Sequence, residues 1–293
     1  MNQQAPNASV DEPPNTLEVH SYGVTDRGRR RPTNEDHFLV AELTKAMHVR
    51  QTSLAAPPAN GSSHRGHLFL VADGMGGHRA GEHASALAVT VIERFALNTL
   101  QWFLPLKAAQ IDEVATDFQG AVEEADATIV AAGAHDAALR GMGTTLTLAY
   151  LYEAELVVVH VGDSRAYLFR AGALRQLTTD HTVVGEMVRR GEIGAAEARR
   201  HDLRHVITNV VGGNEAGVQA ETHSVPVAAG DQLLLCSDGL TEMLSHAEIT
   251  EVLRGEREPE AACSRLVSLA NERGGKDNIT VIVARFDRPR EAV

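Results

Sequence analysis

The spacing of apolar residues along this chain changes period several times, and each change marks a predicted strand or helix. Residues 17–24, "LEVHSYGV", alternate imperfectly, which is typical of a strand with one wetter face, and strands are also predicted at 36–43 and 67–73. Residues 77–100 and 111–132 instead carry apolar side chains at helical spacing. In the second of these helices one stripe contains Val114, Phe118, Val122, Ala125 and Ile129.

Beyond residue 143 the apolar pattern has a period of two or becomes continuous, which favours strands. Four short strands linked by turns predict an antiparallel meander, with the sequences "TTLTLAYL", "ELVVVHVG", "RAYLFRAG" and "ALRQLT". Strands resume in "VQAETHSVPV" and "DQLLLCSD". Helices are predicted at about 240–254 and 259–273, and "NITVIVARF" is the final strand.

Blocks of strands and pairs of helices indicate a layered α+β fold rather than repeated βαβ units. We expect a single domain over residues 17–287, with a polar, disordered leader at 1–16 and a short tail at 288–293. A segment at about 45–66, rich in Pro, Ser, Gly and Asn, is expected to be a mobile inserted loop. Residues 179–213 carry many Arg and His and no apolar stripe, so we expect a surface flap there.

The composition narrows the class of protein. Of the 293 residues, 43% are hydrophobic, which is enough for a large core. The 27 Lys and Arg residues against 39 Asp and Glu give a net charge of −12, which argues against a general binder of nucleic acid or of anionic membranes. The two cysteines form neither a disulfide framework nor a zinc cluster. No secretory signal or membrane span is visible in the sequence, so we expect a cytoplasmic protein.

Carboxylates recur where the predicted strands begin or end. They are Glu35, Asp36, Asp73, Asp163, Asp238 and Asp277. Each alone is compatible with a simple turn, but carboxylates that converge in a buried place are costly unless a counter-charge lies between them. Mg²⁺ or Mn²⁺ would supply that charge through oxygen ligands. Zinc is disfavoured because Cys or paired His residues at ligand spacing are lacking.

Six segments carry a family resemblance, in the order "RPTNED", "VADGMGGH", "GMGTTLTL", "VGDSRAYL", "CSDGL" and "GGKDNITVIV". Together they resemble the metal-dependent protein phosphatases of type 2C, and most of all their bacterial branch. The likeness covers about Val19 to Phe286. It implies a central sandwich of two antiparallel β-sheets flanked by pairs of α-helices, in four layers αββα, with two metal ions at one edge of the sandwich.

The resemblance also implies a set of metal ligands. The aspartate of the "DG" motif, here Asp73, bridges both ions in that family. The carbonyl of Gly74 and the carboxylate of Glu35 hold one ion, and Asp238 and Asp277 hold the other, the ions being Mn²⁺ or Mg²⁺. Glycine suits position 74 because it lets the backbone approach an ion that a side chain would crowd.

Further roles follow from the same likeness. Asp36 would orient a metal-bound water, and Asp163, with Asp238, matches a third and weaker metal site. Arg31 would bind the substrate phosphate through two hydrogen bonds, although without the likeness "RGRRRP" is a solvated basic run. Met75 stands where better-known members place a histidine that protonates the leaving group. A metal-bound water remains a candidate for that role, as do five histidines, namely His48, His78, His181, His201 and His205.

The activity that the resemblance implies is hydrolysis of phosphoserine and phosphothreonine in proteins by a water or hydroxide that bridges two cations. The expected partners are phosphorylated proteins, including a bacterial Ser/Thr kinase and its substrates, which the flap and the inserted loop would select. Two alternatives remain open at this point. One is a catalytically silent regulatory module of the same fold, which usually lacks at least one ligand, and the other is a phosphatase of small molecules.

Overall fold

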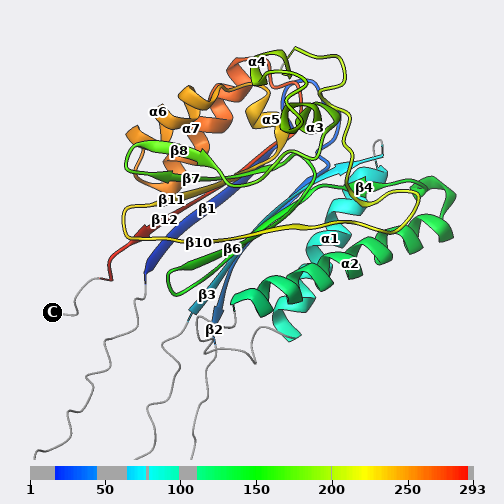
Figure 1. Ribbon diagram of the computed structural model, residues 1–293, viewed down its shortest axis with the longest axis horizontal. Coiled ribbons are helices and arrows are strands. Elements are labelled where there is room, and N and C mark those ends of the chain that lie inside the picture. Colours follow the sequence, from blue (N-terminus) through cyan, green and yellow to red (C-terminus); the bar gives the residue numbers. More distant parts are fainter. Residues whose placement is uncertain (1–16, 45–64, 77–78, 99–110, 199, 290–293) are drawn as a thin grey trace, which may run out of the picture.

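The structure, a computed structural model, describes most of the chain, namely residues 17–44, 65–76, 79–98, 111–198 and 200–289. The expected leader, nearly all of the expected inserted loop and the last four residues lie outside the described residues. The C-terminal end of the predicted loop, at about residue 66, differs from the structure, because β3 begins at Arg65. Two sheets stacked face to face, with helices on both outer sides, form four layers (Figure 1).

All neighbouring strands of both sheets pair antiparallel, as predicted. The larger sheet has seven strands in the order β10-β6-β5-β3-β4-β9, with β2 also paired to β3. Its strands are β2 (Asp36–Thr44), β3 (Arg65–Met75), β4 (Gly143–Thr144), β5 (Leu146–Tyr152), β6 (Glu155–Val161), β9 (Val211–Gly212) and β10 (Glu221–Pro226). The smaller sheet has the order β1-β12-β11-β7-β8. Its strands are β1 (Glu18–Asp26), β7 (Arg165–Arg170), β8 (Ala173–Gln176), β11 (Gln232–Cys236) and β12 (Ile279–Asp287).

Two helix pairs cover the outer faces of the sandwich (Figure 1). The pair α1 (Arg79–Asn98) and α2 (Ile111–His135) packs on the larger sheet, and α6 (His246–Gly255) and α7 (Pro259–Glu272) pack on the smaller one. The remaining helices are short, namely η3 (Ala137–Leu139), α3 (Val183–Arg189), α4 (Ala195–Ala198) and α5 (Asp238–Thr241). Within the described residues, no helix has the length and apolar character that crossing a membrane requires.

Three apolar layers hold the elements together. The predicted stripe of α2 is fully part of the layer against the larger sheet. Strand β11 is buried along its whole length because its side chains alternate between two layers. Leu233 and Leu235 face the other sheet, whereas Leu234 and Cys236 face the helices. Burial on both faces explains why this strand is a continuous apolar run in the sequence.

The predicted four-stranded meander is wrong. Strands β5 and β6 belong to the larger sheet and β7 and β8 to the smaller one. The chain crosses between the sheets at residues 162–164, where Gly162 has a φ of 106° that favours glycine. The prediction of a single helix at about 240–254 is also wrong, because the structure has two helices there, α5 and α6. A capping box formed by Ser245 and Glu248 starts the second of them.

Candidate metal centre

Asp36 and Asp73 lie opposite each other on the antiparallel strands β2 and β3. Oδ2 of Asp36 accepts hydrogen bonds from Ser237 Oγ at 2.8 Å and from Thr280 Oγ1 at 2.6 Å. Its other oxygen, Oδ1, is buried and has no hydrogen-bond partner in the described part of the chain. Burial raises the pKa of Asp36 to about 6, although the two hydroxyl groups act in the opposite direction. Asp36 is thus held rigidly with one acceptor oxygen still to be satisfied.

The end of β3 presents the carboxylate of Asp73 to the same place. The N–H of Asp73 donates to Thr145 Oγ1 at 3.0 Å, and its carbonyl accepts from Thr145 N and Thr144 Oγ1, both at 2.9 Å. Burial raises the pKa of Asp73 well above its ordinary value. Four other carboxylates add repulsion in the same direction, namely Asp36, Asp238, Asp163 and Asp277.

Two more carboxylates reach this place from the ends of other strands. Asp238 is the first residue of α5 and is separated by one residue from the end of β11, and Asp163 is likewise separated by one residue from the end of β6. Oδ1 of Asp238 is buried without a hydrogen-bond partner among the described residues. Burial, and then the charges of Asp163 and Glu242, raise the pKa of Asp238 well above its ordinary value. Burial also raises the pKa of Asp163 to about 6; Asp180 adds to this, and Arg165 opposes it.

Two glycines bring the backbone of β3 against the first turn of α1. A side chain on Gly74 would collide with the carbonyl oxygen of Gly81, and one on Gly81 would collide with Oε2 of Glu35. The N–H of Gly74 also donates to the carbonyl of Glu35 at 3.2 Å. The space between the Glu35 carboxylate and the two glycine backbones therefore suits an ion that takes a carbonyl and a carboxylate as ligands.

Sequence reasoning missed the residues that hold Glu35 in place. Its N–H donates to Oδ1 of Asn278 at 2.9 Å, and its carbonyl accepts from Ser85 Oγ at 2.6 Å. The amide of Asn278 also donates to the carbonyls of Arg27 and Thr33, at 3.0 and 2.9 Å. Gly81 was missed as well. These roles depend on contacts between distant segments of the chain. The only signal in the sequence was the position of Asn278, a short polar residue directly after Asp277.

Arg31 lies at the rim of the cluster. Its Nη2 donates to Oδ2 of Asp277 at 2.5 Å, and about half of its side chain, 53%, remains exposed. The hydrogen bond to Asp277 is the first cause that raises the pKa of Arg31, and the charges of Glu35 and Asp73 act in the same direction. A guanidinium that is exposed and close to these acids can turn toward a bound phosphate.

Three of the five candidate histidines are described, and they lie in different surroundings. His205 Nδ1 is 2.7 Å from Oε1 of Glu242. The ligand atoms of His205, Glu242 and Asp238 all lie within 4.8 Å of one another. His201 instead accepts a hydrogen bond from the N–H of Leu203 in the flap. His48 and His78 lie outside the described residues.

The residues of the cluster fit hard divalent cations. All of the candidate ligands are oxygens, and buried oxygens of Asp36 and Asp238 have no hydrogen-bond partner among the described residues. Burial and mutual repulsion oppose ionisation of Asp73 and Asp238 together. Cations between these carboxylates would remove both problems at once.

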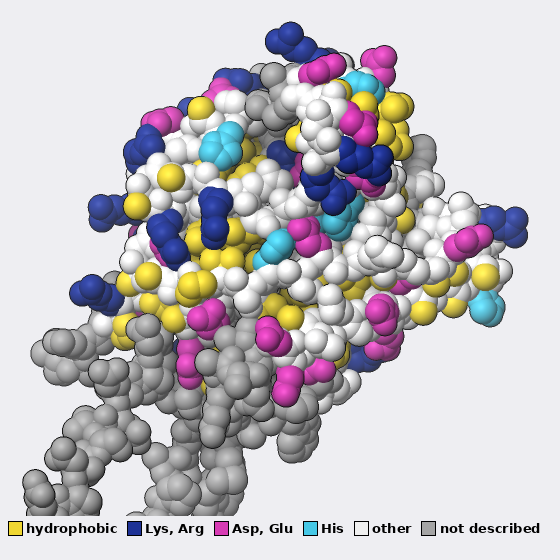
Figure 2. Space-filling model, in the orientation of Figure 1, with side chains coloured by type: hydrophobic (Ala, Val, Ile, Leu, Met, Phe, Trp, Pro, Cys, Tyr) yellow, Lys and Arg dark blue, Asp and Glu magenta, His cyan; other side chains and the backbone are white. Residues whose placement is uncertain are grey.

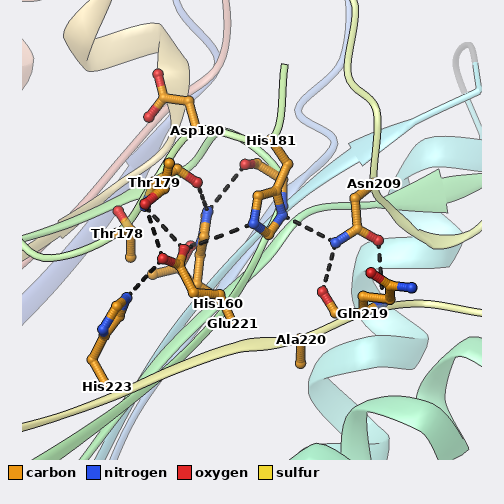
Figure 3. A network of polar contacts seen from close by, with 12 residues as sticks. His160, Thr178, Thr179, Asp180, His181, Asn209, Gln219, Ala220, Glu221 and His223 are labelled. Carbon is orange, nitrogen blue, oxygen red and sulfur yellow. Dashed lines mark hydrogen bonds and ion pairs between the residues drawn. The ribbon is translucent and has the colours of Figure 1, made fainter. Parts of the chain in front are cut away.

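A second group of potential ligands, His160, His181 and Glu221, does not fit a metal ion. Its ligand atoms lie within 4.8 Å of one another (Figure 3). However, Nδ1 of His181 accepts the N–H of Gly162 at 3.1 Å, so the proton of the neutral ring is on Nε2, the nitrogen that faces Glu221 at 3.7 Å. Nε2 of His160 lies 3.0 and 3.1 Å from the carbonyl oxygens of Gly162 and Thr179. Because a carbonyl can only accept, this nitrogen is protonated and donates to them. Both rings thus present a proton where a metal would need a lone pair.

Comparisons with known proteins agree with the fold. The sequence profile of the protein phosphatase 2C family matches residues 59–272. The serine/threonine phosphatase stp of Listeria innocua is 36% identical over 265 residues, which cover 90% of this chain and 95% of that protein. The structure of Stp1 from Staphylococcus aureus covers 92% of this chain and 96% of its own, with 29% identity and a TM-score of 0.76. The catalytic domain of PstP in complex with two manganese ions is 32% identical, with a TM-score of 0.73, over 93% of this chain and all of that one.

Proposed function

The chain belongs to the protein phosphatase 2C family and is a metal-dependent serine/threonine protein phosphatase; we propose that its carboxylate cluster is the catalytic centre and holds two divalent cations, Mn²⁺ or Mg²⁺. The proposed ligands of the two ions are Glu35, Asp73, the carbonyl of Gly74, Asp238 and Asp277. The observation that carries this proposal is the convergence of carboxylates from separate elements, two of which keep buried oxygens without a partner among the described residues.

The bound cations would activate water for attack and neutralise the charge of the phosphate. The residues of the chain would do the rest. Arg31 would release Asp277 and bind phosphate oxygens, because a guanidinium binds two oxygens of one phosphate in a fixed geometry. Asp36, fixed by Ser237 and Thr280, would accept a hydrogen bond from the attacking water and so set its direction.

Asp163 supports a proposal of a third, weaker cation. Its buried carboxylate is close enough to raise the pKa of both Asp73 and Asp238 by charge repulsion. A cation between Asp163 and Asp238 would remove that repulsion. We assign this ion a supporting role, because Asp163 is not among the ligands proposed for the other two.

The alternatives are less well supported. A silent regulatory module would have no use for a complete ligand set, yet the four proposed ligand carboxylates and Gly74 are all present. Each of these five residues is buried or held by contacts with other residues. A small-molecule phosphatase would not need the flap. Among its described residues the flap has four exposed arginines, namely Arg189, Arg190, Arg200 and Arg204, and basic side chains gather over the flap in Figure 2.

We further propose that the substrates include a cytoplasmic Ser/Thr kinase and the proteins that it phosphorylates. The exposed flap arginines would attract phosphorylated and otherwise acidic segments, even though the whole chain has a net charge of −12. Phosphoproteins arise where kinases find ATP, which favours the cytoplasm.

Assay of the purified protein on phosphothreonine peptides tests the proposed function. We expect a strong chelator to abolish turnover and excess Mn²⁺ or Mg²⁺ to restore it, because all proposed ligands are hard oxygens. Full turnover in a sample shown to be free of metal would overturn the proposal.

A further inference from the structure

The turn that presents Asp163 is bound to the base of the flap through Gly162. The N–H of Gly162 donates to Nδ1 of His181 at 3.1 Å, and the carbonyl of Gly162 accepts the N–H of His181 at 2.7 Å. The same carbonyl lies 3.0 Å from Nε2 of His160. Both polar groups of the Gly162 backbone are therefore satisfied by histidines, in a residue whose φ of 106° is unusual.

The next residues of the turn are tied to the same segment of the flap. Arg165 donates from Nε and Nη2 to the two oxygens of Asp180, at 2.8 and 2.5 Å. Asp180 directly precedes His181, just as Gly162 directly precedes Asp163. The Asp163 turn is thus braced on both sides by two consecutive residues at the base of the flap.

His181 also joins the two ends of the flap to each other (Figure 3). Its carbonyl accepts the N–H of Thr208 at 2.8 Å, and its Nδ1 lies 3.1 Å from Nδ2 of Asn209. On the incoming side, Glu221 accepts hydrogen bonds from N and Oγ1 of Thr179, at 3.0 and 2.9 Å. His181 consequently contacts both the Asp163 turn and the far end of the flap.

A further link leads from this turn to Asp73. Oγ of Ser164 lies 2.8 Å from Oγ1 of Thr145, which accepts the N–H of Asp73. A side chain on Gly162 would collide with Thr145. The turn therefore has little freedom to move on the side of the metal centre. On the other side it is held by the Arg165–Asp180 pair and, at the residue next to Asp163, by the hydrogen bond from Gly162 to His181.

We infer that His181 is a positioning residue, which holds the Asp163 turn so that Asp163 can bind the third cation only while the base of the flap is docked. This inference rests on the proposed function. Without an acceptor at position 181, the buried N–H of Gly162 would lose its partner, and the turn would shift to satisfy it. Asp73 lies on β3, and Thr144 Oγ1 and Thr145 N hold its carbonyl independently of the Asp163 turn. The two cations proposed at Asp73 should therefore be affected by His181 much less than the third.

Binding of Mn²⁺ to the full-length, metal-free protein tests this inference without relying on turnover. We expect His181→Leu to reproduce the isotherm of Asp163→Ala, with the weakest class of Mn²⁺ sites weakened about 10- to 100-fold, as for outer residues that orient metal ligands. His181→Asn should retain that class, because the asparagine Oδ1 can replace Nδ1 as the acceptor. His223→Ala is the matched control, since His223 contacts Glu221 in the same network but not Gly162. Combining His181→Leu with Asp163→Ala should have no additional effect.

Several results would overturn the inference. His181→Leu could keep the weakest class that Asp163→Ala loses, or His181→Asn could fail to rescue it. Failure of the proposed function is distinguishable, because Asp73→Asn would then leave all classes of Mn²⁺ sites unchanged. If the leucine variant does not fold, amide hydrogen exchange of the wild type decides. Coupling between sites is reciprocal, so Mn²⁺ at concentrations that fill the weakest class should slow exchange at Gly162 and Thr208, and the absence of slowing would contradict the inference.

Discussion

At the scale of single residues, the centre consists of carboxylates that oppose each other's ionisation. Asp36 and Asp163 each have a pKa raised to about 6 by burial, and Asp73 is affected by all the neighbouring aspartates. Asp238 is affected by a similar set of charges, namely those of Asp163, Glu242, Asp277 and Asp36. The proposal makes Asp73 a ligand of both cations, whereas the charges that raise the pKa of Asp163 are those of Asp180 and Glu242, and Asp163 is assigned only to the third ion.

This difference predicts the order of two variants. Asp73→Asn should reduce kcat on a phosphothreonine peptide by more than about 100-fold, beyond the usual effect of changing an outer residue, because under the proposal it would remove a ligand from both ions. Asp163→Ala should be less harmful at saturating Mn²⁺. Initial rates measured over a Mn²⁺ series check the order, and a larger loss in Asp163→Ala would mean that the primary and third ions have been interchanged.

Arg31 should act on phosphate and not on metal. We expect Arg31→Ala to lower kcat/KM while Mn²⁺ affinity stays unchanged or rises slightly, since Asp277 loses its competing partner. Arg31→Lys should recover only part of the loss, because an ammonium cannot form the two parallel hydrogen bonds of a guanidinium. Steady-state kinetics beside a Mn²⁺ isotherm measures both effects. Weaker Mn²⁺ binding in Arg31→Ala would instead assign Arg31 a structural role.

At the scale of elements, the close contact between β3 and the first turn of α1 leaves no room for a side chain at position 81. Gly81→Ala should weaken Mn²⁺ binding because the new methyl group would displace the Glu35 carboxylate. Gly120→Ala is the matched control, since position 120 lies within the helix α2 with nothing near a new Cβ. That variant should raise the free energy of unfolding by about 0.5–1 kcal/mol through helix propensity and leave Mn²⁺ binding unchanged. Equal Mn²⁺ affinity in both variants would contradict the assigned contact.

The same elements show what a sequence can predict. The stripe of α2 and the continuous apolar run of β11 both follow from burial, so their types are visible in the pattern. The pattern does not show to which sheet a strand belongs, because β6 and β7, on either side of Gly162, both have an apolar interior. Asn278 and Gly81 were missed for a related reason, since their roles arise from contacts across distant segments.

At the scale of the whole molecule, cation binding should be linked to proton release. Among the proposed ligands, Asp163 has a pKa raised from 3.8 to about 6, and Asp73 and Asp238 have pKa values raised well above 3.8. Between the ordinary and the raised values, the metal-free folded chain holds protons that the unfolded chain does not. Cations must displace those protons, so the stability gained from Mn²⁺ is small at low pH and grows as pH rises through 6. Buried His160, whose pKa is lowered to about 4, affects samples with and without Mn²⁺ alike.

We therefore expect saturating Mn²⁺ to raise Tm more at pH 7.5 than at pH 5.5, with protons released on binding at the lower pH. Calorimetric unfolding at both pH values, with and without Mn²⁺, measures the difference. Titration in two buffers of different ionisation enthalpy gives the number of protons. An equal gain in Tm at both pH values would show that the buried carboxylates are not the ligands.

The central claim is that one carboxylate cluster holds two cations and hydrolyses phosphoproteins. The most direct measurement is the number of tightly bound Mn²⁺ ions per chain in the wild type and in Asp73→Asn, determined together with turnover of a phosphothreonine peptide on the same samples. We expect two tight ions in the wild type, and the joint loss of tight binding and turnover in the variant, because the proposal makes Asp73 a ligand of both ions. Two tight ions or substantial turnover in folded Asp73→Asn would contradict the account.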